Sequence, residues 1–294
     1  MDSMSCALLP ATCALCGSPL PHFSSVPVCN SCWMEFPVQS DPVCARCGDV
    51  FEFPDSASAL PSCRKCRLAP PPFVRAVSFG SYEGRMRDAI HALKYGRLHS
   101  AAGRLGEMLA RAISQLAAEA PAELLVVPVP LHRSKYSERG FNQARLLATG
   151  ALASLRRTHP AWRLTLAPST VVRLRATESQ ASLTPRQRRQ NVRGAFVVAD
   201  PRTVAGKHVL VVDDIFTTGA TARSVAQVLL RSGAATVWVA TLARARRTFG
   251  YRGRGDAAHE TLEPEEPGKD PAAVAPTDET EAASMHSSPS QPSF

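Results

Sequence analysis

The chain has 294 residues, of which 45% are hydrophobic, and its formal net charge is +9 at pH 7. This length is enough for one or two domains with a buried core. No apolar run approaches the roughly 18 residues of a membrane span, and the N-terminal residues lack the basic and apolar parts of a signal peptide. These features argue against membrane insertion, and we expect a cytoplasmic protein.

The charge is distributed unevenly along the chain. Residues 254–294 contain nine Asp or Glu and two Lys or Arg, so the first 253 residues carry a net charge of +16. A folded body this basic suggests polyanionic partners, either phosphorylated small molecules or nucleic acid; a solvated basic surface is the alternative. Residues 250–294 are rich in Pro, Ala, Ser and acidic residues and lack an apolar pattern, which predicts a disordered acidic tail.

Cysteine pairs dominate the first 72 residues. Eight of the nine cysteines form four C-x-x-C pairs: Cys13/Cys16, Cys29/Cys32, Cys44/Cys47 and Cys63/Cys66. Each pair can give two thiolates to a tetrahedral zinc ion, so the pattern predicts a double zinc ribbon over 1–72 that holds about two Zn²⁺. We expect sequential pairing, the first pair with the second and the third with the fourth; a cross-braced arrangement is the alternative.

Other uses of these cysteines fit the sequence less well. A disulfide framework would need an oxidising compartment, and a thioredoxin-like site would need a strand and a helix around the C-x-x-C turn. An iron–sulfur cluster is a further alternative to zinc. A segment with so few large apolar side chains needs metal to hold a core, so the ribbons have either a structural role or a role as a nucleic-acid or partner surface.

After the cysteine-rich segment, the pattern changes to alternating strands and helices. Residues 73–119 predict a connecting strand over 73–79 and two amphipathic helices, one from Gly84 onward and one over 99–119. Residues 120–249 predict a separate α/β domain, because apolar strands alternate there with helices as in a doubly wound parallel sheet. Its strands are expected over 123–130, 169–175, 204–214 and 235–243, and its helices over 141–157 and 221–232.

The clearest chemical signal in this domain is V-L-V-V-D-D-I-F-T-T-G-A-T, residues 209–221. A buried strand ends near Asp213 and Asp214, and ligands of an open parallel sheet bind beyond the carboxyl ends of its strands. Two adjacent carboxylates can accept hydrogen bonds from neighbouring sugar hydroxyls or hold a hydrated Mg²⁺. The turn then opens onto a helix, whose N-terminus with the turn amides forms a phosphate site. The residues of this predicted site for a 5′-phosphate are Thr217, Thr218, Gly219, Ala220 and Thr221.

Two other kinds of protein site also have acidic residues at the end of a strand. A Walker B strand requires a G-x-x-x-x-G-K-[S/T] partner, which the chain lacks. A response-regulator pocket has carboxylates at strand ends but no use for the T-T-G-A-T turn. The combination of both features therefore favours a ribose 5-phosphate pocket.

Two basic segments surround the predicted pocket in the sequence. A basic loop after the strand over 123–130 carries Arg133, Lys135 and Arg139, cations suited to a diphosphate leaving group. These three and the two aspartates are the candidate catalytic residues. The polar segment 173–196 is long enough for a flexible lid. Its candidate lid or DNA-contact residues are Thr177, Gln180, Arg186, Arg188, Arg189, Asn191 and Arg193. Solvated arginines, or arginines paired with the acidic tail, are the alternative.

The apolar strand, the two aspartates and T-T-G-A-T resemble the diphosphoribosyl-binding motif of type I phosphoribosyltransferases. The segments HALKY, VPVPLHRSKYSERGFNQA and TESQASLTPRQRRQNVRGAF, in this order after the cysteine array, are similar to the ComF family. This resemblance implies binding of phosphoribosyl diphosphate with Mg²⁺. Asp213 and Asp214 would contact the ribose hydroxyls, and 217–221 would hold the 5′-phosphate. It also implies a role in natural competence, with single-stranded DNA and other DNA-uptake proteins as partners.

Three functions follow from these observations. The first is a phosphoribosyltransferase-like protein, most simply a pentosyl-transfer glycosyltransferase, that acts in the uptake and handling of single-stranded DNA. The second is a non-enzymatic nucleic-acid-binding adaptor in which the sugar-phosphate pocket holds a DNA terminus or a regulatory nucleotide. The third is a salvage phosphoribosyltransferase for a free nucleobase. The retained carboxylates and turn favour ligand binding but do not establish turnover.

Overall fold

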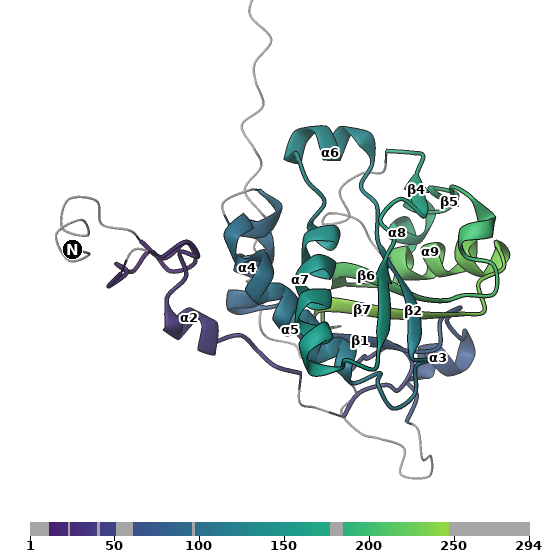
Figure 1. Cartoon of the computed structure of the whole chain (residues 1–294), viewed down its shortest axis with the longest axis horizontal. Coiled ribbons are helices and arrows are strands. Elements are labelled where there is room, and N and C mark those ends of the chain that lie inside the picture. Colours follow the sequence, from purple (N-terminus) through teal and green to yellow (C-terminus); the bar gives the residue numbers. More distant parts are fainter. Residues whose placement is uncertain are drawn as a thin grey trace, which may run out of the picture. The chain divides into compact units, whose positions relative to one another are not determined.

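The computed structural model describes residues 12–22, 24–39, 42–50, 61–95, 98–176 and 185–246. The predicted acidic tail lies outside these residues. Their central feature is a five-stranded sheet with the order β1-β7-β6-β2-β3, in which Figure 1 labels β1, β7, β6 and β2. Its strands are β1 (Ala76–Ser81), β2 (Glu123–Pro128), β3 (Arg163–Leu166), β6 (His208–Phe216) and β7 (Thr236–Arg244).

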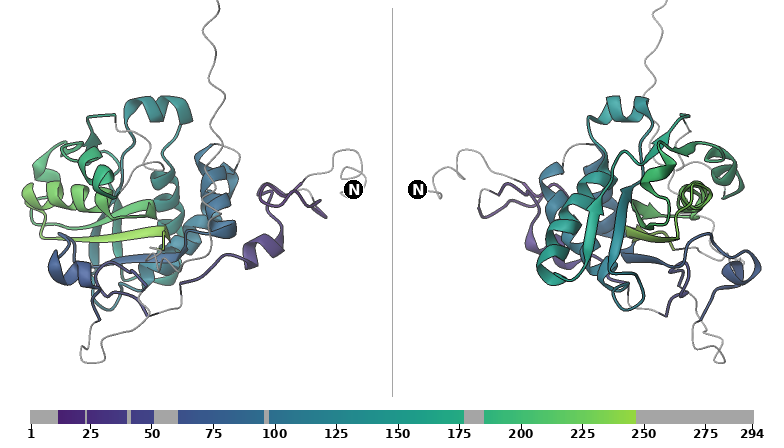
Figure 2. Two further views of the ribbon diagram at one scale, coloured as in Figure 1. Left: turned by 180° about the vertical axis from the view of Figure 1, so that it is seen from behind. Right: turned by 45° about the vertical axis from the view of Figure 1, so that its right-hand side comes forward.

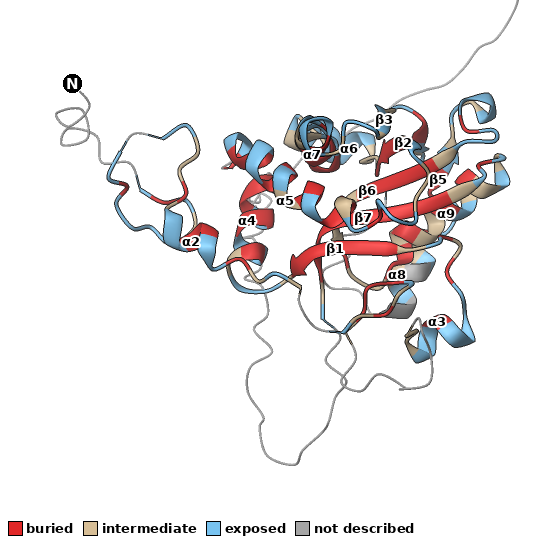
Figure 3. Ribbon diagram, turned by 60° about the horizontal axis from the view of Figure 1, so that its bottom comes forward, coloured by how far each residue is buried: buried red, intermediate tan, exposed pale blue. Residues whose placement is uncertain are grey.

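All neighbouring strands of this sheet are parallel, as the alternating pattern predicts. Strands covered on both faces are nearly continuous apolar runs, and β6 and β7 are accordingly buried over most of their length (Figure 3). The expected α/β class with a doubly wound parallel sheet is confirmed. The strand β1 from segment 73–119 belongs to this sheet as the neighbour of β7.

Part of the predicted strand pattern is wrong. The strand expected over 169–175 is only β4 (Val171–Arg173), and it lies outside the parallel sheet, paired antiparallel with β5 (Phe196–Val198). The edge strand β3 was not predicted, because its four residues alternate between exposed and half-buried positions and form no apolar run.

Helices cover both faces of the sheet (Figure 2). On one face α4 (Gly84–Lys94), α5 (Ala102–Ser114) and α7 (Gln143–Thr158) share a buried cluster with the even-numbered residues Leu210 and Val212 of β6. On the other face α9 (Ala220–Arg231) packs with the odd-numbered Val209 and Val211. Because side chains alternate along a strand, neighbouring residues of β6 face different helices.

The helices α5 and α7 pack closely where each has a glycine. A Cβ atom on Gly106 would lie 2.7 Å from the Cα atom of Gly150, so a larger residue would push the two helices apart. The remaining helical elements are short. They are α2 (Asn30–Met34), α3 (Arg64–Leu68), η1 (His99–Ala101), α6 (Arg133–Arg139), α8 (Pro185–Asn191) and η2 (Pro201–Thr203). Among the described residues, none of the helices is both long and apolar enough to cross a membrane.

The cysteine-rich segment consists of two similar hairpin-like units. Each begins with a short bridge, between Thr12 and Pro19 in the first unit and between Val43 and Val50 in the second. Cys13, Cys29 and Cys32 of the first unit pack into the cluster that contains α5 and α7, whereas the cysteines of the second unit pack into the cluster that contains α9. Each unit therefore adds to the core of a different face of the sheet.

Candidate functional site

Asp213 and Asp214 lie side by side near the carboxyl end of β6, which continues beyond them to Phe216. The strand is thus slightly longer than predicted. Because neighbouring residues alternate in direction, Asp214 faces the side of α4 and Asp213 the side of α9. Asp214 is 5% exposed, so its charge needs a partner in the protein.

That partner is Lys94, the last residue of α4. Its Nζ atom lies 3.1 Å from Oδ2 of Asp214, and Oδ1 of Asp214 accepts a hydrogen bond from the Ile215 amide. Burial has the largest single effect on the pKa of Lys94 and lowers it, but the charge of Asp214 together with Tyr82 and Asp213 outweighs burial, and the net shift is upward. Burial likewise raises the pKa of Asp214, but the ammonium of Lys94 together with hydrogen bonds to Asp213 and the Ile215 amide outweighs it, so the net shift is downward. Both groups are therefore charged in the folded protein.

Asp213 is electrostatically different from its neighbour. Burial, and then the negative charge of Asp214, hold the pKa of Asp213 well above its usual value. Its Oδ1 atom accepts a hydrogen bond from the Asp214 amide at 2.9 Å. Arg173 of β4 lies nearby: burial lowers the pKa of this guanidinium, while the Asp213 charge opposes that shift. The aspartate pair thus combines one firmly ionised carboxylate with one that binds a proton more readily.

The turn after β6 has the geometry expected of a phosphate site. Gly219 caps the N-terminus of α9 with φ of 76°, in the left-handed region. A Cβ atom there would also lie 2.6 Å from the Phe216 ring, so both conformation and space require glycine. Thr217, Thr218 and Thr221 are half-buried around the first turn of the helix, where amide groups have no intrahelical partner. Hydroxyls and amides gathered at this end suit an oxygen-rich anion.

The basic segment after β2 is a short helix, α6, and not the predicted loop. The His132 side chain caps its start by accepting a hydrogen bond from the Ser134 amide, and Gly140 ends it with φ of 75°. Because β2 and β6 are parallel, α6 begins at the same edge of the sheet as the aspartates. Arg133 and Lys135 are exposed there, and Lys135 contacts Glu138. Two of the predicted diphosphate cations are therefore accessible at this edge.

The third predicted cation is held more firmly. Arg139 donates to the side chain of Gln143 at 3.3 Å, and its guanidinium lies 5.8 Å from the centre of the Tyr95 ring. Tyr95 directly follows Lys94. The end of α4 therefore reaches both the aspartate pair and α6. Lys94 and Tyr95 were part of the HALKY segment, but the sequence pattern alone assigned them no role.

The predicted lid is only partly described. Thr177 and Gln180 lie outside the described residues, and Arg186 and Arg189 belong to α8, although their side chains are not among those described. Burial lowers the pKa of Arg188 in the same helix. The end of α8 is held beside α9, since the Ser224 hydroxyl donates to the Val192 carbonyl at 3.1 Å.

The backbone after α8 is also held in place. The Arg175 guanidinium donates to the carbonyls of Asn191 and Arg193. The Arg193 side chain itself is exposed. The end of the arginine-rich segment is thus bonded to α9 and to Arg175, which follows β4.

The cysteines form two tetrads with the predicted sequential pairing, Cys13/Cys16/Cys29/Cys32 and Cys44/Cys47/Cys63/Cys66. In a tetrahedral zinc–thiolate site with bonds of about 2.3 Å, sulfur atoms lie about 3.8 Å apart. The sulfur atoms of Cys16 and Cys29 are 3.7 Å apart, and those of Cys47 and Cys63 are also 3.7 Å apart. The amide of Cys63 donates to the Cys44 sulfur. Both tetrads fit a zinc ion.

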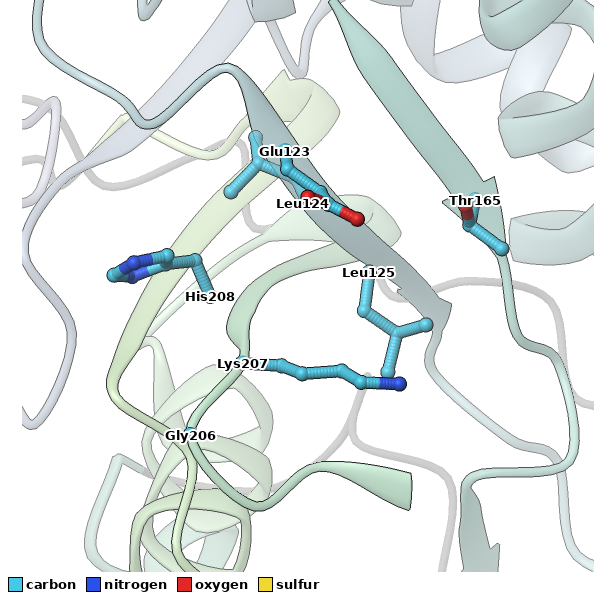
Figure 4. Close-up of a pocket in the computed structure, with 7 residues that line it drawn as sticks. All are labelled: Glu123, Leu124, Leu125, Thr165, Gly206, Lys207 and His208. Atoms are coloured by element: carbon cyan, nitrogen blue, oxygen red, sulfur yellow. The ribbon is translucent and has the colours of Figure 1, made fainter.

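A hollow of about 250 Å³ lies away from this site (Figure 4). Its lining includes Glu123 and His208, the first residues of β2 and β6, together with Lys207. These strands are parallel, so the hollow is at the amino ends of the strands, opposite the aspartates. It therefore plays no part in the candidate site.

Comparisons with known proteins agree with this architecture. The family described as "Phosphoribosyl transferase domain" matches residues 164–262, and "Double zinc ribbon domain" matches residues 4–67. The solved structure of a glutamine phosphoribosylpyrophosphate amidotransferase from B. subtilis covers 48% of this chain and 26% of its own, at 24% identity and a TM-score of 0.30. This overlap is too low to bear on the site.

Relatives match over most of the chain. DNA utilization protein YhgH of Shigella flexneri is 34% identical over 241 residues, which are 80% of this chain and 98% of that protein. The YhgH protein of Escherichia coli (strain K12) has the same identity and coverage. Competence protein F of Haemophilus influenzae is 27% identical over 76% of this chain and 93% of its own. The chain therefore belongs to the ComF family, in which a double zinc ribbon precedes a phosphoribosyltransferase-like domain.

Proposed function

We propose that the protein binds phosphoribosyl diphosphate together with Mg²⁺ at the carboxyl edge of its parallel sheet. The observation that carries this proposal is that a half-buried carboxylate, Asp213, and a buried one, Asp214, lie on β6 next to a glycine turn at the start of α9. A ribose 5-phosphate needs hydrogen-bond acceptors for its hydroxyls and, close to them, a site that binds its phosphate. Carboxylates and a helix N-terminus a few residues further along the chain supply both.

Each group has a distinct task in this proposal. Asp213 and Asp214 orient the ribose through its 2- and 3-hydroxyls, and residues 217–221 hold the 5′-phosphate. Lys94 keeps Asp214 ionised despite its burial. Bound Mg²⁺ would neutralise part of the diphosphate charge, and oxygen-rich groups of this kind are the ligands it prefers.

We further propose that the site supports pentosyl transfer. In that reaction an acceptor bonds to C1 of the ribose while the bond from C1 to the diphosphate oxygen breaks. Negative charge then gathers on the leaving diphosphate, and preorganised cations at that position lower the barrier. Arg133 and Lys135 at the start of α6 are exposed at the correct sheet edge for this task, and Arg139 lies further along the same helix.

The biological role we propose is the handling of single-stranded DNA during its uptake, together with other DNA-uptake proteins. Two of the relatives are named for DNA utilization and competence. The basic body with its +16 charge and the exposed arginines near the site are suited to phosphate groups. Eight cysteines acting as zinc thiolates require a reducing compartment, so we propose a cytoplasmic location.

Calorimetric titration of the full-length protein with phosphoribosyl diphosphate, with and without Mg²⁺, tests the binding proposal. We expect Mg²⁺-dependent binding that is lost in the double variant Asp213→Asn, Asp214→Asn. Glu107→Gln, an exposed carboxylate of α5 that pairs with Arg157, is a control for a carboxylate outside the pocket and should retain binding. Unchanged affinity in the folded double variant would contradict the proposed ribose contacts.

A further inference from the structure

The second cysteine tetrad and the phosphate turn belong to one buried cluster. Cys44, Cys47 and Cys66 pack in the same cluster as Phe216 and Ala220. The buried cysteines of the first tetrad pack in the other cluster, on the opposite face of the sheet. The two metal sites of this chain therefore differ in their relation to the candidate pocket.

Arg244 connects the second tetrad to the sheet. It is the last residue of β7 and is only 3% exposed. Its Nη2 atom lies 3.1 Å from Oδ1 of Asp49 and 3.8 Å from the Cys47 sulfur. Its Nε and Nη1 atoms find no hydrogen-bond acceptor among the described residues. A buried guanidinium needs compensating negative charge, and Asp49 of the second zinc ribbon supplies it.

The other side of Arg244 faces the phosphate turn. Its guanidinium carbon lies 4.5 Å from the centre of the Phe216 ring. The same ring fills the space beside Gly219, since a Cβ atom on that glycine would lie 2.6 Å from the ring. The ring is thus in contact with the guanidinium and with the turn. A displacement of Arg244 would remove one of the contacts that hold the Phe216 ring beside the turn; the edge-to-face contact with Phe73 is another.

A second connection reaches the helix that starts at the turn. Arg223 of α9 donates to the carbonyls of Ala69 and Pro70. These residues directly follow α3, the short helix that carries Cys66. The second zinc ribbon therefore contacts both the turn, through Arg244 and Phe216, and the first part of α9.

We infer that Arg244 is a positioning residue for the phosphate turn, and that zinc in the second tetrad is coupled to ligand binding at that turn while zinc in the first is not. Metal orders the ribbon that carries Asp49 and Cys47. Loss of that order leaves Arg244 without Asp49 and Cys47 and weakens its contact with the Phe216 ring. The identity of the ligand rests on the proposed function; the coupling itself does not. Coupling between two sites is reciprocal, so a ligand bound at the turn should also strengthen zinc binding in the second tetrad.

Arg244→Gln tests this inference in the full-length zinc-loaded protein. We expect its affinity for phosphoribosyl diphosphate to fall by about tenfold or more, within the usual range of such couplings. Phosphoribosyl diphosphate should slow the chelator-driven release of one of two zinc ions in the wild type but not in the variant. Arg85→Gln is the matched control, because Arg85 donates to the Leu15 carbonyl between the first two cysteines of the first tetrad. The affinity of Arg85→Gln for phosphoribosyl diphosphate should stay within about twofold of the wild-type affinity.

Hydrogen exchange separates the coupling from the ligand's identity. In the absence of ligand, amides of residues 214–222 should exchange faster in Arg244→Gln than in Arg85→Gln. If Arg244→Gln does not fold, Asp49→Asn, which removes the charged partner of Arg244, replaces it in this experiment. If the wild type fails to bind phosphoribosyl diphosphate but these amides respond, the proposed function is wrong and the coupling stands. Unchanged exchange together with unchanged zinc release in the folded variants would overturn the coupling.

Discussion

Replacing Lys94 by methionine should destabilise the protein in a pH-dependent way. The Lys94 and Asp214 side chains are 23% and 7% exposed, and their charged atoms are 3.1 Å apart. Removing one partner of a buried ion pair costs about 3–5 kcal/mol, because the other charge stays buried without compensation. Lys94 is partly exposed, so we expect the lower end of that range, about 3 kcal/mol of unfolding free energy at pH 8.

The sign of the pH dependence follows from Asp214. In the wild type burial raises its pKa, but Lys94 together with hydrogen bonds to Asp213 and the Ile215 amide holds the pKa below its usual value, so the pair still contributes at pH 5. In the variant the lowering effect of Lys94 is lost while burial remains, so the pKa of Asp214 rises. A carboxyl with a raised folded-state pKa favours the folded state at low pH and loses this effect as the pH rises. The destabilisation should therefore be smaller at pH 5 than at pH 8.

Urea unfolding at the two pH values measures this difference. Lys135→Met is the matched control, because Lys135 also forms an ion pair, with Glu138 at 2.7 Å, but both side chains are about half exposed. That variant should lose less than about 1 kcal/mol at either pH. Adding Asp214→Asn to Lys94→Met should recover part of the loss. An equal loss at pH 5 and pH 8, or a loss no larger than in the control, would refute the buried ion pair.

Three further predictions concern the metal, the turn and DNA. Protein purified without chelator should contain about two zinc ions per chain by elemental analysis, and one ion would mean that only one tetrad closes. Gly219→Ala should cost about 1–3 kcal/mol in thermal or urea unfolding, because of its positive φ and the nearby Phe216 ring; an unchanged stability would contradict that geometry. Single-stranded DNA binding should weaken with salt at a log–log slope of roughly −0.7 per phosphate contact. Alanine at Arg186, Arg188 and Arg189 should lower that slope, and an unchanged slope would place the DNA contacts elsewhere.

The features that could be predicted from the sequence are those fixed by neighbouring residues. The spacing of two neighbouring C-x-x-C turns is enough to predict a metal site, and the predicted sequential pairing was confirmed. The strand with Asp213 and Asp214, the turn and the following helix are also adjacent in the chain. Residue types and spacing therefore carry most of the information about this part of the site.

The remaining features depend on contacts between distant parts of the chain. Lys94 ends an ordinary amphipathic helix, and only the packing of α4 brings it to Asp214. Arg244 is a single cation at the end of an apolar strand, and its role appears only when the second ribbon contacts β7. The helix α6 has no buried residue and thus no apolar period, so its caps at His132 and Gly140 were the only available signal.

A crystal structure of the protein with phosphoribosyl diphosphate and Mg²⁺ would test the proposed site most directly. We predict that the 5′-phosphate lies at the N-terminus of α9, within hydrogen-bonding distance of amides in 217–221, and that the ribose hydroxyls contact Asp213 and Asp214. Ligand density in the hollow beside Glu123 and Lys207, with none at the turn, would contradict the assignment of the site to the carboxyl edge of the sheet.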